Sequence, residues 1–257
     1  MDGTRIVFER SGKGPSVILV GGALSTRTAA RDIAALLAPN LVAYAYDRRG
    51  RGGSGDTAPY AIEREVEDLQ ALIEEAGGSA FVFGHSSGAG LTLETAVRIG
   101  GIDRAALYEP PYIIDDSRAS IPPEYPHRLA EMLAQGRRGD AVEYFLTVGV
   151  GLPKEAVAPM REGPSWQPLE ELAHTLPYDI EIMSANVVDA QLPVEAWRSI
   201  TVPVLVMDGE ASPEWSRNSV LAVADALPAG TRRSLPGQTH QVDPGVLAPV
   251  LVEFFLG

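Results

Sequence analysis

Short apolar runs alternate with segments of helical spacing along most of the chain. The segment Ser16 to Val20 is continuously apolar after its serine, which is typical of a strand covered on both faces. From Tyr60 to Ala76 apolar residues recur every three or four positions, which predicts an amphipathic helix that Gly77 and Gly78 end. The same pattern predicts strands over 4–10, 41–46, 81–83, 104–108, 202–208 and 232–235, and helices over 29–37, after Gly88, over 215–227 and over 246–256. This alternation predicts an α/β fold with a mainly parallel, doubly wound sheet.

The pattern changes between residues 111 and 198. Prolines are frequent there, no convincing strand occurs, and helix-like segments over 124–135 and 140–150 follow one another. We therefore expect residues 1–110 and 199–257 to form the α/β core, and residues 111–198 to form a helical cap inserted into it.

Composition and charge narrow the classes of partner. A formal net charge of −13 in 257 residues argues against a nucleic-acid or acidic membrane surface, because phosphate contacts need clustered Lys and Arg. No apolar run approaches the roughly 20 residues of a spanning helix, and no basic segment followed by an apolar one opens the chain. We expect a cytoplasmic protein that binds neither nucleic acid nor membrane.

The absence of cysteine excludes disulfides, thiolate nucleophiles and thiolate metal sites. No H-E-x-x-H, EF-hand, G-x-G-x-x-G or phosphate-loop motif is present either. The expectation is that the protein uses neither a metal nor a cofactor. The arginine–glycine run from Asp47 to Gly55 is instead expected to be braced by pairing of Asp47 with an arginine.

The motif Gly84-His85-Ser86-Ser87-Gly88 stands between a strand and a helix, which is the context of a G-x-S-x-G nucleophile elbow. Small residues must flank the serine because its backbone is crowded. Ser86 is the candidate nucleophile, and the backbone N–H of Ser87, at the start of the helix, is a candidate oxyanion donor. The alternative is that Ser86 only caps the helix.

The strand ending at Val20 is followed by Gly21, Gly22 and Ala23. Glycines at that edge allow a loop to fold closely over the elbow, and the backbone N–H of Ala23 is then the candidate second donor of an oxyanion hole. A plain turn at the exit of the strand is the alternative.

A serine hydroxyl is a weak nucleophile without a base. Of the four histidines, His240 follows the last predicted strand and is the candidate general base. His85 is expected to pack or to line the pocket, since neighbouring side chains on the elbow diverge. His127 and His174 lie in the predicted cap and are expected to be solvated or structural.

The carboxylate that would orient the base has three candidates. Glu109 directly follows the strand after the elbow helix and is stiffened by two prolines, so it is favoured. Asp208 and Glu210 are the alternative acids. Asp243, followed by Pro244, is expected to cap the last helix.

These motifs together resemble those of the α/β-hydrolase superfamily over nearly the whole chain, in its serine-nucleophile branch with a helical cap. Members usually carry Asp three residues after the glycine that corresponds to Gly209, where this chain has Ser212. Some members instead carry the acid after the strand that follows the elbow helix, which matches Glu109. The superfamily spans esterases, lactonases, thioesterases and other enzymes, so the resemblance does not specify a substrate.

The sequence therefore predicts a serine hydrolase that cleaves a small or medium, largely apolar carboxylic ester, lactone or thioester through an acyl-enzyme. Two alternatives remain: a cofactor-free lyase, isomerase or cyclase that uses the same pocket, and a non-catalytic receptor for a small molecule. The expected partner is a small-molecule substrate, and apolar residues of the cap could also form a homodimer contact.

Overall fold

A seven-stranded sheet forms the centre of the computed structural model, which describes residues 2–184 and 191–257. The strand order is β1-β3-β2-β4-β5-β6-β7; β1 is antiparallel to β3, and all other neighbours are parallel. The strands are β1 (Phe8–Gly12), β2 (Ser16–Val20), β3 (Val42–Tyr46), β4 (Ala80–His85), β5 (Ile102–Tyr108), β6 (Val204–Gly209) and β7 (Gly230–Leu235). The predicted α/β fold class with a mainly parallel sheet is confirmed.

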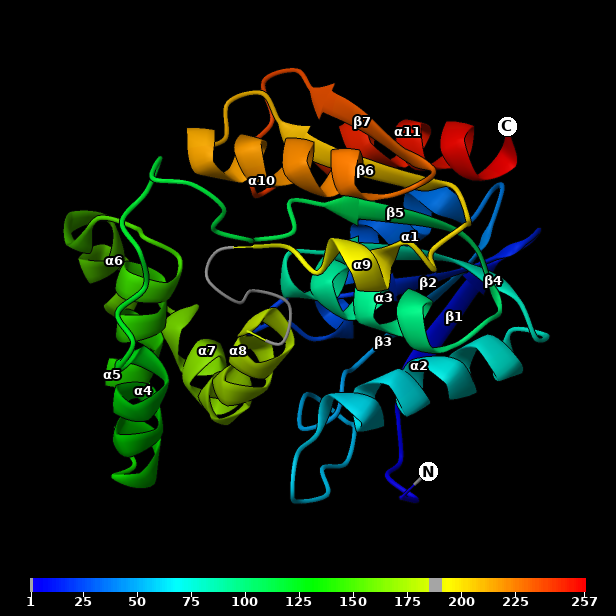
Figure 1. Ribbon diagram of the computed structural model, residues 1–257. Helices are drawn as coiled ribbons and strands as arrows, with labels where there is room; N and C mark the ends of the chain where they lie inside the picture. Colours follow the sequence, from blue (N-terminus) through cyan, green and yellow to red (C-terminus); the bar gives the residue numbers. More distant parts are fainter. Residues whose placement is uncertain (1, 185–190) are drawn as a thin grey trace.

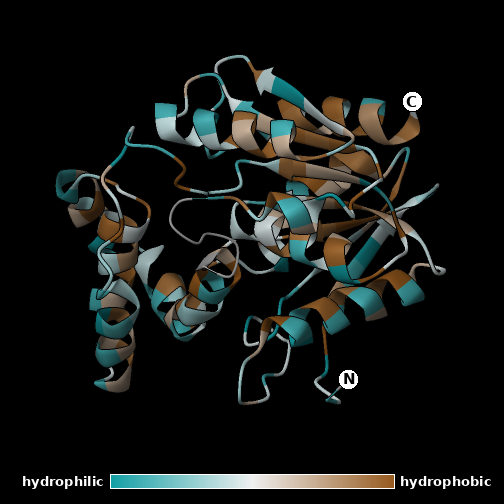
Figure 2. Ribbon diagram, in the orientation of Figure 1, coloured by the Kyte–Doolittle hydropathy of each residue, from teal (hydrophilic) through white to brown (hydrophobic). Residues whose placement is uncertain are grey.

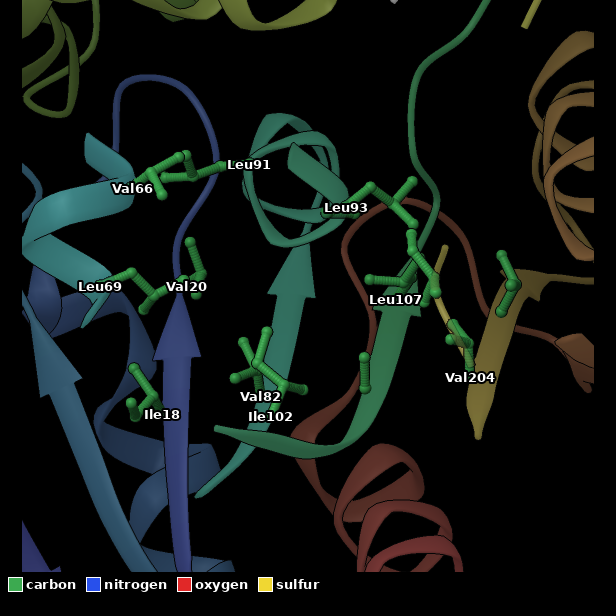
Figure 3. Close-up of a cluster of buried hydrophobic side chains, with 14 of the residues drawn as sticks. Ile18, Val20, Val66, Leu69, Val82, Leu91, Leu93, Ile102, Leu107 and Val204 are labelled. Carbon is green, nitrogen blue, oxygen red and sulfur yellow. The ribbon is translucent and has the colours of Figure 1, made fainter. Parts of the chain in front are cut away.

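Helices cover both faces of this sheet (Figure 1). One face is covered by α2 (Ile62–Glu75), α3 (Ser87–Arg98) and α10 (Glu214–Ala226), and the other by α1 (Arg31–Leu37) and α11 (Pro244–Leu256). Figure 3 shows side chains of β2 and β4, such as Ile18 and Val82, in one buried cluster with Leu69 of α2 and Leu91 of α3. Burial on both faces explains why the inner strands β2 and β3 are almost entirely apolar, whereas the edge strand β7 is polar and largely exposed.

Helix α2 shows how the hydropathy pattern directs packing. Its buried apolar residues recur at helical spacing, while the opposite side is polar, as the brown and teal sides of the helix show in Figure 2. These buried residues are Ile62, Val66, Leu69, Leu72 and Ile73. An apolar stripe of this kind orients the helix against the sheet.

The chain between β5 and β6 is mainly helical and contains α4 (Tyr125–Ala134), α5 (Arg138–Tyr144), α6 (Lys154–Arg161), α7 (Trp166–Leu172), α8 (Leu176–Ser184) and α9 (Val194–Trp197). Figure 1 shows α4 to α8 gathered beside the carboxyl ends of the strands. They share a buried apolar cluster, against which Ala23 and Leu24 of the core also pack. Residues 185–190, inside the predicted cap range 111–198, lie outside the described residues.

Two elements differ from the sequence-based expectation. The strand expected over 4–10 begins only at Phe8, because the preceding residues bond the loop after β3 instead: Gly55 N–H donates to Arg5 O at 2.8 Å. The helix expected over 140–150 is α5 continued by a π-helical turn, Phe145–Gly149. Among the described helices, none combines the length and hydropathy needed to cross a membrane.

Candidate active site

Ser86 lies on the sharp turn between β4 and α3. Its backbone has φ 56° and ψ −126°, a conformation that non-glycine residues rarely adopt and that costs about 1–3 kcal/mol. A Cβ on Gly84 would lie 2.5 Å from Gly88 O, and one on Gly88 would lie 2.3 Å from Val20 O, so neither position can carry a side chain. The local geometry is therefore that of a nucleophile elbow, and the glycine spacing in the sequence reports its crowding.

The loop after β2 closes over this turn. A Cβ on Gly22 would lie 2.9 Å from Ser86 Cβ and 3.5 Å from Ser86 Oγ, which shows how closely the loop approaches the serine. Ala23 follows Gly22 in this loop, and Ser87 is the first residue of α3. The two predicted oxyanion donors thus belong to segments that meet at Ser86.

His240 contacts Glu109 across the ends of β5 and β7. The imidazole Nδ1 and Glu109 Oε2 are 2.8 Å apart, and Glu109 is only 1% exposed. Glu109 Oε1 accepts two more hydrogen bonds, from Gly209 N–H at 2.9 Å and from the Ser212 hydroxyl at 2.5 Å. Burial raises the pKa of Glu109, but the bonds from His240, Ser212 and Gly209 outweigh it, so the pKa lies below its usual range. The carboxylate is ionised and can hold an imidazolium.

The two alternative acids lie elsewhere. Asp208 is fully buried and accepts hydrogen bonds from Arg232 Nε at 3.0 Å and from the Ser234 hydroxyl at 2.8 Å, both on β7. Glu210 is exposed, and among the described residues its carboxylate accepts only a long bond, from Gly237 N–H at 3.4 Å. In the described part of the chain, Glu109 is thus the carboxylate that reaches His240.

Ser212 is a site residue to which the sequence assigned no role. It stands three residues after Gly209, where members of the superfamily that the sequence resembles usually have Asp, and its hydroxyl donates to Glu109, the candidate acid. In the sequence, the only sign of this role was that Ser212 departs from the family pattern. That departure could not show that the side chain at position 212 still contacts the candidate acid.

His85 supports the loop that carries His240. Its Nε2 lies 3.0 Å from His240 O, and the two rings are 4.7 Å apart between centroids. Tyr108 assists by donating its hydroxyl to Thr239 O at 2.7 Å. Burial, together with the charge on His240, lowers the pKa of His85 to about 4. His85 therefore stays neutral at pH 7 and donates to the carbonyl. Of the two histidines in the inserted segment, His127 is exposed and His174 is half-buried.

This lowered pKa predicts that the protein is destabilised by acid. An exposed histidine has a pKa of about 6.5, so between pH 6.5 and 4 the unfolded chain binds a proton that folded His85 does not. This proton uptake by the unfolded chain does not occur above pH 6.5, so His85 does not destabilise the fold there. As the pH drops from 6.5 to 4, the free energy of unfolding falls. His85→Gln should remove about 2–3 kcal/mol of the loss in unfolding free energy between pH 7 and 4.5, as measured by urea titration. The exposed His127→Gln should leave that loss unchanged, and equal losses in both variants would contradict the assignment.

The loop after β3 is held by ion pairs with neighbouring elements, including the inserted helices. Asp47 accepts bonds from Arg27, which lies outside the run, and from Gly53 N–H at 2.8 Å. The expected bracing of the loop by Asp47 and an arginine thus uses Arg27. Within the run, Arg49 pairs with Asp68, while Arg48 and Arg51 are buried against a carboxylate from the inserted helices.

Known proteins resemble this chain both in sequence and in structure. The model of the Alpha/beta hydrolase family matches residues 17–250. The chain is 56% identical to an alpha/beta hydrolase from Sphaerobacter thermophilus, with 99% of this chain and 97% of that chain covered and a TM-score of 0.94. No curated protein matches it.

More distant solved structures share the fold. An esterase from Exiguobacterium antarcticum is 18% identical, with coverage of 100% and 97% and a TM-score of 0.74. The enol-lactonase from Burkholderia xenovorans is 21% identical, with coverage of 100% and 98% and a TM-score of 0.71. At these identities the likeness extends to the fold alone.

Proposed function

Because this chain belongs to the alpha/beta hydrolase family, we propose that it is a serine hydrolase acting on a small or medium, largely apolar carboxylic ester, lactone or thioester. The observation that carries the proposal is the pairing of the buried Glu109 with the partly exposed His240, at the sheet edge that also carries the strained elbow of Ser86. A carboxylate, an imidazole and a serine follow the ends of three strands of one sheet, which is the arrangement that activates a hydroxyl nucleophile.

In the proposed mechanism, Ser86 Oγ attacks the substrate carbonyl while His240 Nε2 takes its proton. Glu109 holds the proton on Nδ1, so Nε2 is the free acceptor, and the ionised carboxylate stabilises the imidazolium. The N–H groups of Ala23 and Ser87 bind the oxyanion. The imidazolium then protonates the leaving group, and water activated by His240 releases the acyl group from Ser86.

The preference for an apolar substrate rests on the surroundings of the loop after β2. Ala23 and Leu24 pack against the cluster that the inserted helices share, and Phe145, Leu146 and Ile180 are only partly buried in it. A ligand held at Ser86 would thus meet aliphatic and aromatic side chains. An esterase and an enol-lactonase among the structural neighbours agree with ester or lactone cleavage.

The test is a panel of p-nitrophenyl esters of increasing acyl length, together with lactones and acyl thioesters. We expect turnover of at least one class, a burst of p-nitrophenol, and labelling by a fluorophosphonate that mass spectrometry maps to Ser86. The burst would demonstrate an acyl-enzyme, which a lyase or a receptor does not form, and the label would identify Ser86 as the activated nucleophile. No turnover of any substrate, or a label on another residue, would refute the proposal.

A further inference from the structure

The inserted helices contribute a buried carboxylate to the back of the elbow. Asp179 of α8 is 3% exposed. Its Oδ1 accepts hydrogen bonds from the Ser87 hydroxyl at 2.7 Å and from Arg48 Nη1 at 2.8 Å, and its Oδ2 accepts one from Arg51 Nη2 at 2.7 Å. Asp179 thus holds the side chain of the residue whose N–H is a proposed oxyanion donor.

The same two arginines reach the loop that carries the other proposed donor. Arg51 Nη1 donates to Gly22 O at 2.6 Å, and Arg48 Nη1 donates to Gly21 O at 3.3 Å. Ala23 follows directly. Through two arginines and one hydroxyl, Asp179 is therefore connected to both segments that meet at Ser86.

The charges in this cluster balance. Arg48 also forms a two-pronged pair with Glu65, both contacts at 2.7 Å, so two buried cations face two buried carboxylates. Burial raises the pKa of Asp179, but Arg51 and Arg48 outweigh it, so the pKa lies below its usual range. Removing this one charge would leave a buried cation without its partner, and the arginines would move or bind water.

We propose that Asp179 is a positioning residue that fixes the two oxyanion donors relative to each other. This rests on the proposed function, since it concerns the chemistry at Ser86. An oxyanion hole acts only when its donors are already aligned at hydrogen-bonding distance, so small displacements weaken it. Because Asp179 belongs to α8, the docking of the inserted helices sets the geometry in which the core does its chemistry.

The chain offers a matched control for Asp179→Asn. Asp68 is likewise buried and pairs with an arginine of the same loop, Arg49, with contacts of 2.8 and 2.9 Å. That pair contacts neither Ser87 nor the loop after β2. Asp68→Asn therefore removes from α2 the buried carboxylate that pairs with another arginine of the same loop, without touching either donor segment.

The decisive kinetic measurement compares an oxygen ester with the corresponding thionoester, whose carbonyl carries sulfur. The developing sulfur anion accepts weaker hydrogen bonds, so it gains less from an aligned oxyanion hole. The measured quantity is kcat/KM for the ester divided by kcat/KM for the thionoester, and this ratio is independent of the fraction of folded enzyme. We expect this ratio to fall at least about tenfold in Asp179→Asn, mainly through kcat for the ester, and to stay unchanged in Asp68→Asn.

Ser87→Ala is the second variant, and it keeps the proposal testable if Asp179→Asn does not fold. It removes the hydroxyl bond and leaves the arginine pairs intact, so the ratio should fall in the same direction by a smaller factor. An unchanged ratio in Asp179→Asn, or in Ser87→Ala where only that variant folds, would overturn the role in catalysis.

Hydrogen exchange separates this proposal from the proposed function, because it needs no turnover. Amides in peptides that cover residues 21–25 and 86–89 should exchange faster in Asp179→Asn than in Asp68→Asn. If the unaltered protein hydrolyses no ester, the proposed function fails, while exchange still decides whether Asp179 holds both segments. Equal exchange in the two variants would overturn the positioning role.

Discussion

Replacing Ser86 by alanine is expected to lower kcat on the best ester substrate by about 10⁴-fold or more, with little change in KM. The variant lacks the hydroxyl that forms the proposed acyl-enzyme, but it keeps the loop of Ala23 and the proposed base His240. A small residual rate is expected, because binding and oxyanion stabilisation persist without the nucleophile. The loss therefore measures the covalent pathway itself.

The measurement is a steady-state assay combined with fluorophosphonate labelling of the same preparation. Ser86→Ala should lose both activities and keep the circular dichroism spectrum of the unaltered chain. Ser199→Ala serves as the control, because Ser199 is exposed and its hydroxyl, within the described residues, bonds only Ala196 O, at 2.8 Å. Turnover in Ser86→Ala within tenfold of the unaltered chain would exclude the acyl-enzyme mechanism.

The strands and the elbow could be predicted because their cause is local. Two-sided burial makes Val17 to Val20 of β2 an uninterrupted apolar run, and crowding at the turn requires glycine at positions 84 and 88. Each feature leaves a mark within a few residues of sequence. The fold class and the superfamily resemblance rested on such marks, and both are confirmed.

The carboxylate that contacts His240 could not be identified in this way, because three carboxylates stand at or just after the predicted ends of strands. The difference arises from backbone direction. Asp208 is still within β6, in register with Ser234, and its side chain bonds β7. Glu109 lies beyond β5, its N–H bound to Met207 O at 2.9 Å and its φ at 46°, which turns the carboxylate toward His240.

The role of Asp179 was equally hidden from the sequence. It lies 92 residues from Ser87 and 128 residues from Arg51 in the sequence. The hydropathy pattern of its helix shows that the helix is packed, but does not show which element it packs against. A buried ion pair between residues so far apart in the sequence produces no periodic pattern of apolar and polar residues. Only the docking of α8 on the elbow brings the three side chains together.

Glu109→Gln is expected to lower kcat/KM by about 10³–10⁴-fold. The amide cannot stabilise the imidazolium, and it can present an N–H to Nδ1, which would place the proton on the wrong nitrogen. Glu210→Gln is the matched control, because Glu210 is exposed and makes no contact with His240 in the described part of the chain. It should retain activity within a factor of about two. A comparable loss in both variants would mean that Glu109 is not the orienting acid.

Ser212 allows this role to be tested by restoration as well as by loss. Its hydroxyl already lies 2.5 Å from Glu109 Oε1, so a carboxylate at position 212 starts close to the place of the missing one. Ser212→Asp in the background of Glu109→Ser should regain at least about tenfold of the lost kcat/KM, whereas Ser212→Asp alone should be impaired, because two adjacent carboxylates repel. Opposite signs for one substitution in the two backgrounds would identify a single acid site shared by two positions. If the double variant is no more active than Glu109→Ser, the carboxylate acts only from the backbone position after β5.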